Sequence, residues 1–311
     1  MSDKEFKSLN KQLRILRVRG VNTGNGSMSK RLLEFENYYS VVNGYKDPFV
    51  VSSGSTGDVY RPGTTLREIA AVYEFDRELR VLLLPSLLLL EHHVKAVVAY
   101  EFSRNYTHHD YLRLQNFDVG TQDKIKNTSL LIANLHQDIV QSAKDPCISH
   151  YLTTYGSVPL WVLANAISFG RLSVFYSNMK LPDRQAVAKH FGIGQDVLGS
   201  FLRCLSLFRN RCAHDERVYN FKAKDSVQET ALHSSLQLAR RPGGRYVYGT
   251  DDILAVLIGV RVLCGKTLVN TLVRGLSSSL DRLSRKISTV SVTEIMDRMG
   301  LPSNWRNVAR L

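Results

Sequence analysis

The sequence predicts an all-α protein built from many helices, and three observations support this fold class. Apolar residues recur at the three- and four-residue spacing of amphipathic helices along most of the chain. No run with a two-residue period is long enough to form a real sheet. Proline and glycine mark the boundaries between helical stretches, as at Asp145-Pro146, Leu181-Pro182 and Gly192-Ile193-Gly194.

Size and composition indicate a globular protein that binds a polyanion. The chain has 311 residues, enough for one large or two modest domains, and 44% of them are hydrophobic. Its formal net charge is +13, from 41 lysines and arginines against 28 acidic residues. We expect nucleic acid rather than an acidic membrane surface as the partner, because no polybasic run flanks an apolar segment.

Neither the cysteines nor the apolar stretches indicate secretion or a membrane. The four cysteines lack the spacing of a zinc or disulfide framework, and residues 1–6 lack the apolar core of a signal peptide. Pro85 interrupts the leucine-rich stretch 81–90, and Arg261 lies inside the apolar stretch 253–264. Both stretches fall short of the roughly 20 residues that a spanning helix needs. We therefore expect core helices, a cytoplasmic location and no membrane partner.

The first 63 residues are expected to contain basic helices and a turn-rich segment. Residues 4–19 form a basic helix, and residues 30–40 resume the helical spacing. Residues 42–58 are rich in turn residues and end in a Ser/Gly loop. Lys11 and Arg14 of the first helix are candidates for gripping an RNA backbone, although a solvated helix face is equally ordinary.

Longer helices are expected after residue 63. One begins at Thr64-Thr65, where Glu68 completes a capping box, and kinks at Pro85. Residues 195–213 form an amphipathic helix, residues 251–274 a buried one, and the tail adds shorter pieces. The expected organisation is one compact unit with three parts: 1–63, a helical core at 64–225, and a C-terminal helical extension at 226–311.

The most informative segment lies at the end of the helix expected at 195–213. Arg209 and His214 stand five positions apart, and Asn210 follows the arginine directly. Histidine can accept and donate protons near neutral pH, and the planar guanidinium of arginine can grip a phosphate. RNA carries its own nucleophile, the ribose 2′-hydroxyl, so these groups could cleave it without a metal. The products would be a 2′,3′-cyclic phosphate and a 5′-hydroxyl end.

Helical geometry limits how these catalytic candidates can meet. At about 100° per residue, Arg209 and His214 lie about 140° apart around an ideal helix, whereas Asn210 and His214 share a face. Either the helix ends near Ala213 and swings His214 outward, or a second copy of the motif completes the site across a two-fold interface. We favour a homodimer with a composite active site.

Residues around the motif are candidates for binding RNA. Tyr219 could stack a base or pack in the core. Lys46 could touch RNA, or its turn could pin two helices. Asp215 and Glu216 directly follow His214, and Arg217 could neutralise them. The RNA-binding candidates are Arg203, Arg211, Arg217, Tyr219, Lys46, Lys11 and Arg14.

Other patterns predict neither a metal nor a cofactor. The adjacent pairs His92-His93 and His108-His109 lack the i, i+4 spacing that places two imidazoles on one metal, so surface or interhelical roles are expected. Asn25-Gly26 and Gly192-Ile193-Gly194 complete neither a dinucleotide fingerprint nor a P-loop. The competing interpretation of the motif is a surface ion-pair network in which His214 caps the helix C-terminus.

The motif and three further blocks resemble a known family. The run Arg209-Asn210-Arg211-Cys212-Ala213-His214, followed by Arg217-Val218-Tyr219-Asn220, is similar to the signature of bacterial abortive-infection proteins of the Abi-like (AbiD/AbiF) group. The other similar blocks, which follow the family's order within about residues 10–225, are Leu33 to Phe49, Tyr73 to Arg80 with Glu91 beyond it, and Pro159 to Ser173.

The resemblance implies a fold and an activity. It implies a HEPN-like helical bundle with additional N- and C-terminal helices, a dimeric active site, and metal-independent RNA cleavage that halts growth during phage infection. It assigns catalytic roles to Arg209 and His214 and a positioning role to Asn210. It also implies a small non-coding RNA that restrains the toxin. Asp215 departs from the basic residue that many relatives have after the histidine, which puts the proton transfers in doubt.

Two functions remain in competition, and a third is disfavoured. The first is a toxin-like endoribonuclease in antiviral defence, and the second is a non-catalytic module that holds a regulatory RNA. The third, a helical DNA-binding regulator, lacks a helix-turn-helix with a defined recognition helix.

Overall fold

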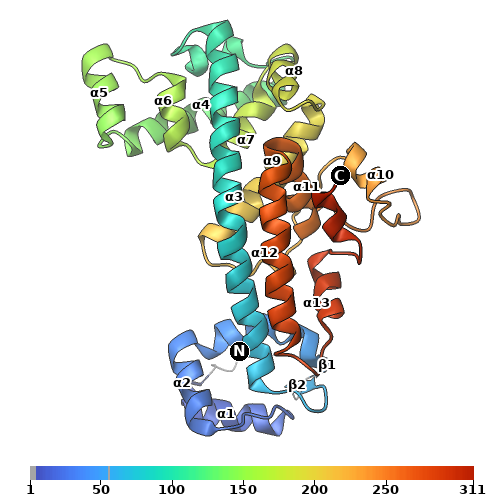
Figure 1. Cartoon of the computed structure of the whole chain (residues 1–311). Helices are drawn as coiled ribbons and strands as arrows, with labels where there is room; N and C mark the ends of the chain where they lie inside the picture. The colour runs from blue at the N-terminus through green and yellow to red at the C-terminus, as the bar shows by residue number, and fades with distance from the viewer. Residues whose placement is uncertain (1–4, 55–56) are drawn as a thin grey trace.

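A single long helix organises the molecule. The computed structural model describes residues 5–54 and 57–311, and α3 (Leu66–Tyr106) runs through it as a central rod (Figure 1). Elements from both sides of α3 in the sequence pack along it, and a two-stranded hairpin is the only sheet among the described residues. The prediction of an all-α protein is confirmed.

The start of α3 follows the expected capping chemistry, and the helix continues through Pro85, where a kink was expected. The backbone N–H of Glu68 donates to Thr65 Oγ1 (3.1 Å), and the backbone N–H of Thr65 donates to Glu68 Oε2 (3.0 Å), which confirms the capping box. Pro85 lies inside one continuous helix of 41 residues. Pro85 removes the N–H that the Val81 carbonyl would accept, and both residues are exposed, so water can solvate that carbonyl.

The continuity of α3 changes the expectation about membrane-spanning length. An 18-residue window of α3 has a mean hydropathy of 1.6, so by length and composition alone this helix could cross a membrane. The expectation that no stretch is long enough is therefore wrong, because it counted Pro85 as a break. In the structure 44% of that window is buried, and α3 packs against α6 (Leu160–Ala166), α9 (Gln195–Ala213) and α12 (Lys266–Ser284).

The N-terminal elements cover one end of α3 (Figure 1). They are α1 (Leu9–Val18), α2 (Gly26–Glu36), a π-helical turn (Tyr39–Asn43), a 3-10 turn (Asp47–Phe49), β1 (Val50–Gly54) and β2 (Gly57–Tyr60). The loop expected at 52–58 is therefore part of an antiparallel hairpin, although its residues 55–56, like Lys4 of the expected first helix, lie outside the described residues. Strand β1 has the sequence Val-Val-Ser-Ser-Gly and is mostly exposed, so it lacks the apolar alternation that predicts a strand.

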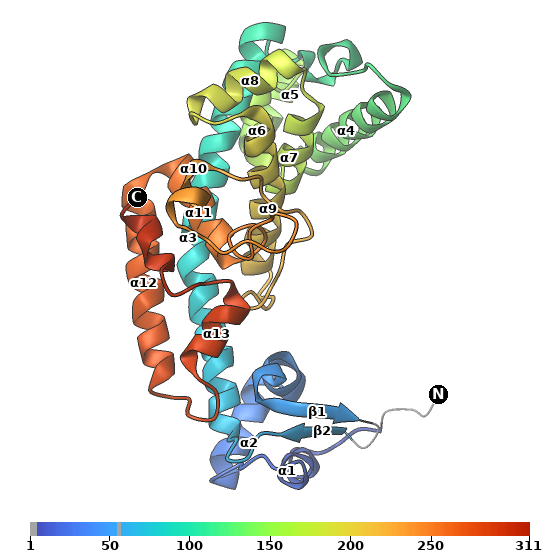
Figure 2. The same ribbon diagram turned by 90° about the vertical axis from the view of Figure 1, so that its right-hand side faces the viewer.

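Five helices gather at the opposite end of α3. After 3-10 turns at Asp110–Leu112 and Leu114–Asn116, the chain forms α4 (Gln122–Gln141), α5 (Pro146–Tyr155), α6, α7 (Phe169–Asn178) and α8 (Leu181–His190). Helix α9 then leads back toward the middle of α3 (Figure 2). The C-terminal end of α9 therefore lies between the two ends of the molecule.

The C-terminal segment flanks the central part of α3. It comprises α10 (Ala231–Ser235), α11 (Ile253–Cys264), α12, α13 (Val292–Met299) and a 3-10 turn (Trp305–Ala309). Both views show α12 beside α3 (Figures 1 and 2). The single helix expected at 251–274 is two helices, because Gly265 has a φ of 88° that a regular helix does not allow.

Candidate functional site

Helix α9 presents the motif at its C-terminal end. The helix covers Gln195–Ala213, which confirms the predicted element, and its apolar stripe is buried against α3 and α7. The stripe includes Leu198, Phe201, Leu202, Leu205 and Phe208. Burial of this face leaves Arg209 and Asn210 partly exposed at the last turn and His214 exposed beyond it.

A buried carboxylate of α3 holds the Arg209 side chain in place. Its Nε donates to Glu91 Oε2 (2.8 Å), and its Nη1 donates to Asn210 Oδ1 (3.3 Å). The other oxygen of Glu91 pairs with Lys95 Nζ (2.9 Å), which also donates to the carbonyl of Ile167 (2.6 Å). Glu91 is 4% exposed, so the pair is desolvated and fixed in place. Within the described residues, Nη2 of Arg209 has no protein partner, so it can donate to a ligand.

His214 leaves the helix instead of continuing it. Its backbone N–H still donates to the Asn210 carbonyl (2.9 Å), and its side chain is exposed with no hydrogen bond to any described residue. Asp215 follows with a φ of 56°, and the N–H of Glu216 donates to the Arg211 carbonyl (3.0 Å), as in a Schellman ending. The alternative in which the helix ends near Ala213 and turns His214 outward is the one observed.

A second buried carboxylate of α3 holds the loop after the motif. Asp76 is fully buried and accepts from Arg80 Nη1 (2.6 Å), from the Tyr45 hydroxyl (2.6 Å) and from the backbone N–H of Tyr219 (2.6 Å) and of Val218. Arg80 also donates to Asp215. Burial acts to lower the pKa of Arg80, but the Asp76 carboxylate, Tyr45 and Asp215 outweigh it and raise that pKa. The hydrogen bonds of this pair are therefore taken up by protein groups.

This network gives two residues a structural role. Asp76 and Arg80 form an interior ion pair of the scaffold. Tyr219 is fully buried and stacks on Tyr45, with ring centroids 5.7 Å apart. The expectation that Tyr219 could stack an RNA base is wrong for this structure, because neither face of its ring reaches solvent. Its core alternative is the one observed.

The cysteine inside the motif is inert. Cys212 is 6% exposed, and burial is the main cause that raises the pKa of its thiol to about 12. At neutral pH this thiol stays protonated, so it is neither a nucleophile nor a metal ligand.

A basic cavity opens on the other side of α9 from the core. Its volume is about 320 Å³, and the residues that line it are Leu207, Asn210, Arg211, Glu216, Phe221, Lys222 and Lys224. The Arg211 guanidinium lies 4.0 Å from the centroid of the Phe221 ring and 3.2 Å from Glu216. Lys224 has no protein partner among the described residues, and Lys222 pairs with Asp252 (3.3 Å) while 44% of its side chain remains exposed. The cavity therefore offers Asn210 and cations to one ligand.

The remaining RNA-binding candidates lie in ion pairs around the molecule. Lys46 pairs with Asp58 (2.6 Å), Arg203 with Asp225 (3.7 Å), and Arg217 with Asp47 (3.5 Å). Arg217 therefore does not neutralise Asp215 or Glu216, which pair with Arg80 and Arg211 instead.

The two candidates on α1 are not part of the motif region. Lys11 pairs with Glu5 (3.2 Å), and Arg14 is exposed. Both views place α1 at the N-terminal end of the molecule, away from the C-terminal end of α9 (Figures 1 and 2). Lys11 and Arg14 can touch RNA only if it extends well beyond the motif.

Two residues of the site were missed as functional from the sequence alone. Glu91 entered only as a position in a similar block, and Lys95 was not considered. A signal was present, because Glu91 and Lys95 are charged residues four apart on the apolar face of a long helix. Charges in such a place need a partner, and Arg209 supplies it. In the described part of the chain, no three His, Cys, Asp or Glu side chains gather as a metal site.

The comparisons with known proteins identify the family. No curated protein and no solved structure matches the chain significantly. A family model described as Abi-like protein matches residues 31–220, more than half of the 311 residues. The match includes Glu91 and Lys95 of α3 and the whole motif of α9, and it leaves out α1 and everything from α10 onward. The chain therefore belongs to the Abi-like family, which is linked to abortive infection.

Proposed function

We propose that this Abi-like protein is a metal-independent endoribonuclease of the HEPN type, a toxin of antiviral defence that acts in the cytoplasm. The observation that carries the proposal is the end of α9. There a guanidinium is fixed by a buried carboxylate and keeps an unused donor, and an exposed histidine follows five residues later. A fixed cation and an accessible proton carrier are the two groups that cleavage through the 2′-hydroxyl requires.

Each motif residue has a distinct role in this proposal. His214 moves the proton of the 2′-hydroxyl or of the leaving 5′-oxygen. Arg209 stabilises the negative charge that builds on the phosphorus oxygens, and Glu91 holds its fork in one orientation. Asn210 positions the RNA, since it lies on both the Arg209 side and the wall of the basic cavity. Arg211, Lys222 and Lys224 bind the backbone of the same strand.

A second copy of the chain completes the reaction. The attacking and leaving oxygens lie on opposite sides of the phosphorus, so a base and an acid are needed on two sides. One motif supplies one histidine. An isologous dimer supplies two. Helix α3 carries the exposed apolar side chains Val81 and Leu88 about a quarter turn from the face with Arg80 and Glu91, and the exposed Leu89 extends this strip toward the opposite face. Pairing along this strip would bring two motifs close together.

The test is cleavage of single-stranded RNA in EDTA. The parent protein should produce 2′,3′-cyclic phosphate and 5′-hydroxyl ends, and His214→Ala should slow cleavage about 10²- to 10⁴-fold. Because the His214 side chain is exposed and makes no hydrogen bond to a described residue, the variant should have the same unfolding temperature as the parent protein. The matched control is His136→Ala, an exposed histidine of α4, which should cleave like the parent.

A second candidate function shares the same residues. In it Arg209 and the basic cavity hold a regulatory RNA without cutting it. Salt-dependent binding by the parent protein with no cyclic-phosphate ends would favour this module. The restraining small RNA of the first proposal has a separate measurement: its co-expression should restore growth of cells in which the parent protein is toxic.

A further inference from the structure

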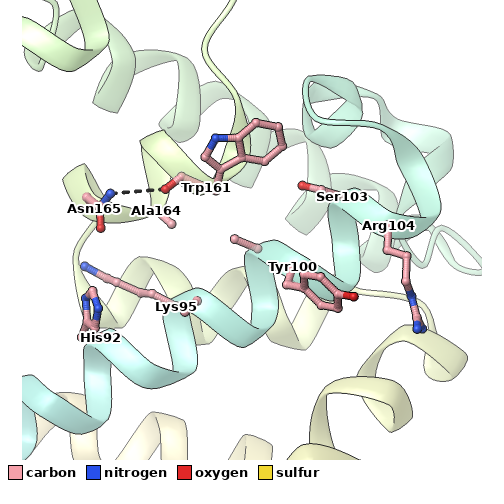
Figure 3. Close-up of a pocket in the computed structure, with 10 residues that line it drawn as sticks. His92, Lys95, Tyr100, Ser103, Arg104, Trp161, Ala164 and Asn165 are labelled. Carbon is pink, nitrogen blue, oxygen red and sulfur yellow. Dashed lines mark hydrogen bonds between the residues drawn. The ribbon is translucent and has the colours of Figure 1, made fainter.

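A second cavity, larger than the basic cavity beside the motif, lies outside the motif. Its volume is about 590 Å³, and it opens between α3 and α6 (Figure 3). Its lining residues are His92, Lys95, Ala96, Ala99, Tyr100, Ser103, Arg104, Trp161, Ala164 and Asn165. Lys95 joins the two regions, because its Nζ contacts Glu91, which holds Arg209. The cavity therefore begins one helical turn along α3 from Glu91, the residue that holds the proposed catalytic arginine.

Two aromatic side chains form exposed walls of this cavity. Trp161 is 49% exposed and Tyr100 is 62% exposed, values far above those of the core aromatics. Figure 3 shows Trp161 on α6 across the opening from Tyr100 and Ser103 on α3. The His108 ring packs against the tryptophan in a tilted geometry, with ring centroids 5.7 Å apart. Large exposed rings at the rim of a cavity are typical of sites that stack a flat ligand.

Hydrogen bonds at both ends of α6, the helix that carries Trp161, join it to α3 and to the segment that follows α3. At the start of α6, the backbone N–H of Leu160 donates to the His108 carbonyl (2.9 Å), and at its end Lys95 Nζ donates to the Ile167 carbonyl (2.6 Å). Asn165 Nδ2 donates to the carbonyl of Trp161 itself (3.3 Å). A ligand that enters between α3 and α6 therefore meets a preformed slot, so less ordering opposes its binding.

The polar groups of the cavity fit a base better than a phosphate. Both cations are already paired, Lys95 with Glu91 (2.9 Å) and Arg104 with Glu101 (2.6 Å). The Oγ of Ser103 is buried and has no hydrogen-bond partner among the described residues. The Ser103 hydroxyl can donate a hydrogen bond to the edge of a stacked base or accept one from it.

We infer that the slot between α3 and α6 is a nucleobase-binding subsite for single-stranded RNA, in which Trp161 and Tyr100 stack an unpaired base. The inference rests on the proposed function for the identity of the strand. Tyr100 lies nine residues beyond Glu91, about 14 Å along the helix and on its opposite face, so the strand would also pass around α3. A strand whose phosphate lies at Arg209 reaches the slot within a few nucleotides. Stacking on aromatic rings tolerates any base, so the subsite adds affinity with little sequence preference.

The chain contains a built-in reporter for this subsite. It has two tryptophans, and the other, Trp305, is fully buried. A base stacked on Trp161 should quench its fluorescence and leave that of Trp305 as a constant background. The experiment uses the full chain with His214→Ala, so that RNA stays intact, and a dye-labelled single-stranded 12-nucleotide oligoadenylate as the probe.

Three variants and one altered probe separate stacking from other causes. Trp161→Leu keeps an apolar side chain but loses the ring, and it should weaken RNA affinity about 5- to 100-fold in fluorescence anisotropy. Trp161→Phe should bind within about threefold of the parent and lose the quench. Tyr155→Leu, an exposed aromatic of α5, is the matched control and should change neither readout. An abasic oligomer with the same phosphates should cause no quench.

Several outcomes would overturn the inference. One is RNA that binds without quenching Trp161, and another is Trp161→Leu that binds as tightly as the parent. A third is a change in self-association of Trp161→Leu, measured by sedimentation, with RNA affinity intact, because the slot would then be a contact between copies. Failure of the proposed nuclease activity gives a different result. If the parent protein produces no cleaved RNA ends but RNA still quenches Trp161, the nuclease proposal is wrong and the nucleobase subsite stands.

Discussion

Two ion pairs with the same spacing on α3 differ in what they hold. Asp76–Arg80 and Glu91–Lys95 are both i, i+4 pairs, both are buried, and both hold the end of α9. Asp76 and Arg80 bond only to protein: to backbone N–H groups, Tyr45 and Asp215. Glu91 holds an arginine that keeps a free donor at the surface. Under the proposed function, the number of donors left over, more than burial or charge, distinguishes the pair that supports Arg209 from the pair that only holds the scaffold.

The largest expected effect tests the scaffold pair. Asp76→Asn removes the charge that Arg80 needs and weakens the bonds to the loop at 218–219, so unfolding should become easier by about 3–5 kcal/mol. Urea denaturation monitored by circular dichroism measures the loss. A cost below about 1 kcal/mol would mean that Asp76 is not the anchor of this loop.

Glu68 is a third carboxylate of α3, and like Asp76 it holds the scaffold together. Glu68 accepts from the backbone N–H groups of Ser288 (2.7 Å) and Thr289 (2.8 Å), and these bonds outweigh burial and lower its pKa to about 2. The folded pKa lies below the usual 4.5, so the stabilisation is complete above that pH and is lost as pH falls toward 2. The amount lost should be about 3 kcal/mol.

Glu68→Gln provides the control for this pH dependence. The variant should be less stable at pH 7, and the part of its stability that changes between about pH 4.5 and 2 should shrink. Thermal unfolding across this range measures both quantities. An unchanged acid profile would assign the loss to other carboxylates.

The same chemical change in the functional pair should affect activity first. Glu91→Gln keeps the size of the side chain but loosens the grip on Arg209, so kcat for RNA cleavage should fall about 10- to 100-fold. Stability should fall less than in Asp76→Asn, because Lys95 keeps its bond to the Ile167 carbonyl. Glu91→Asp should recover part of kcat, which a purely structural role would not produce. Equal stability losses at both sites would break the comparison.

The smallest effects belong to the basic cavity. Lys222→Ala and Lys224→Ala should each weaken RNA binding a few-fold and reduce the slope of log affinity against log salt by about 0.7. Lys126→Ala, an exposed lysine of α4, is the matched control and should leave the slope unchanged. A control slope that falls equally would mean that binding follows overall charge rather than this cavity.

The sequence predicted best where local chemistry decides the structure. Thr65 and Glu68 cap α3 as expected, and α9 spans the expected residues, because capping and helical periodicity depend on neighbours in the chain. The break at Gly265 and the continuity at Pro85 depended on the wider setting. A helix tolerates proline when the freed carbonyl faces water, and exposure cannot be read from the proline itself.

The site shows the same limit. Arg209, Asn210 and His214 share the end of one helix, and their place there followed from the sequence. Glu91 is 118 positions from Arg209 in the chain, and only the packing of α3 on α9 brings them together. The burial of Tyr219 also depends on a distant partner, Tyr45, and on Asp76. Long-range pairs of this kind have no local signature.

Because α3 is one continuous helix, the protein should tolerate few insertions or deletions within it. Arg80 and Glu91 hold opposite sides of the motif from the same rod, with no loop between them to absorb a difference in length. Inserting one amino acid between them would rotate one anchor by about 100° relative to the other and shift it by about 1.5 Å. Substitutions at exposed positions of this stretch are compatible with the site, whereas a single-codon insertion or deletion is not.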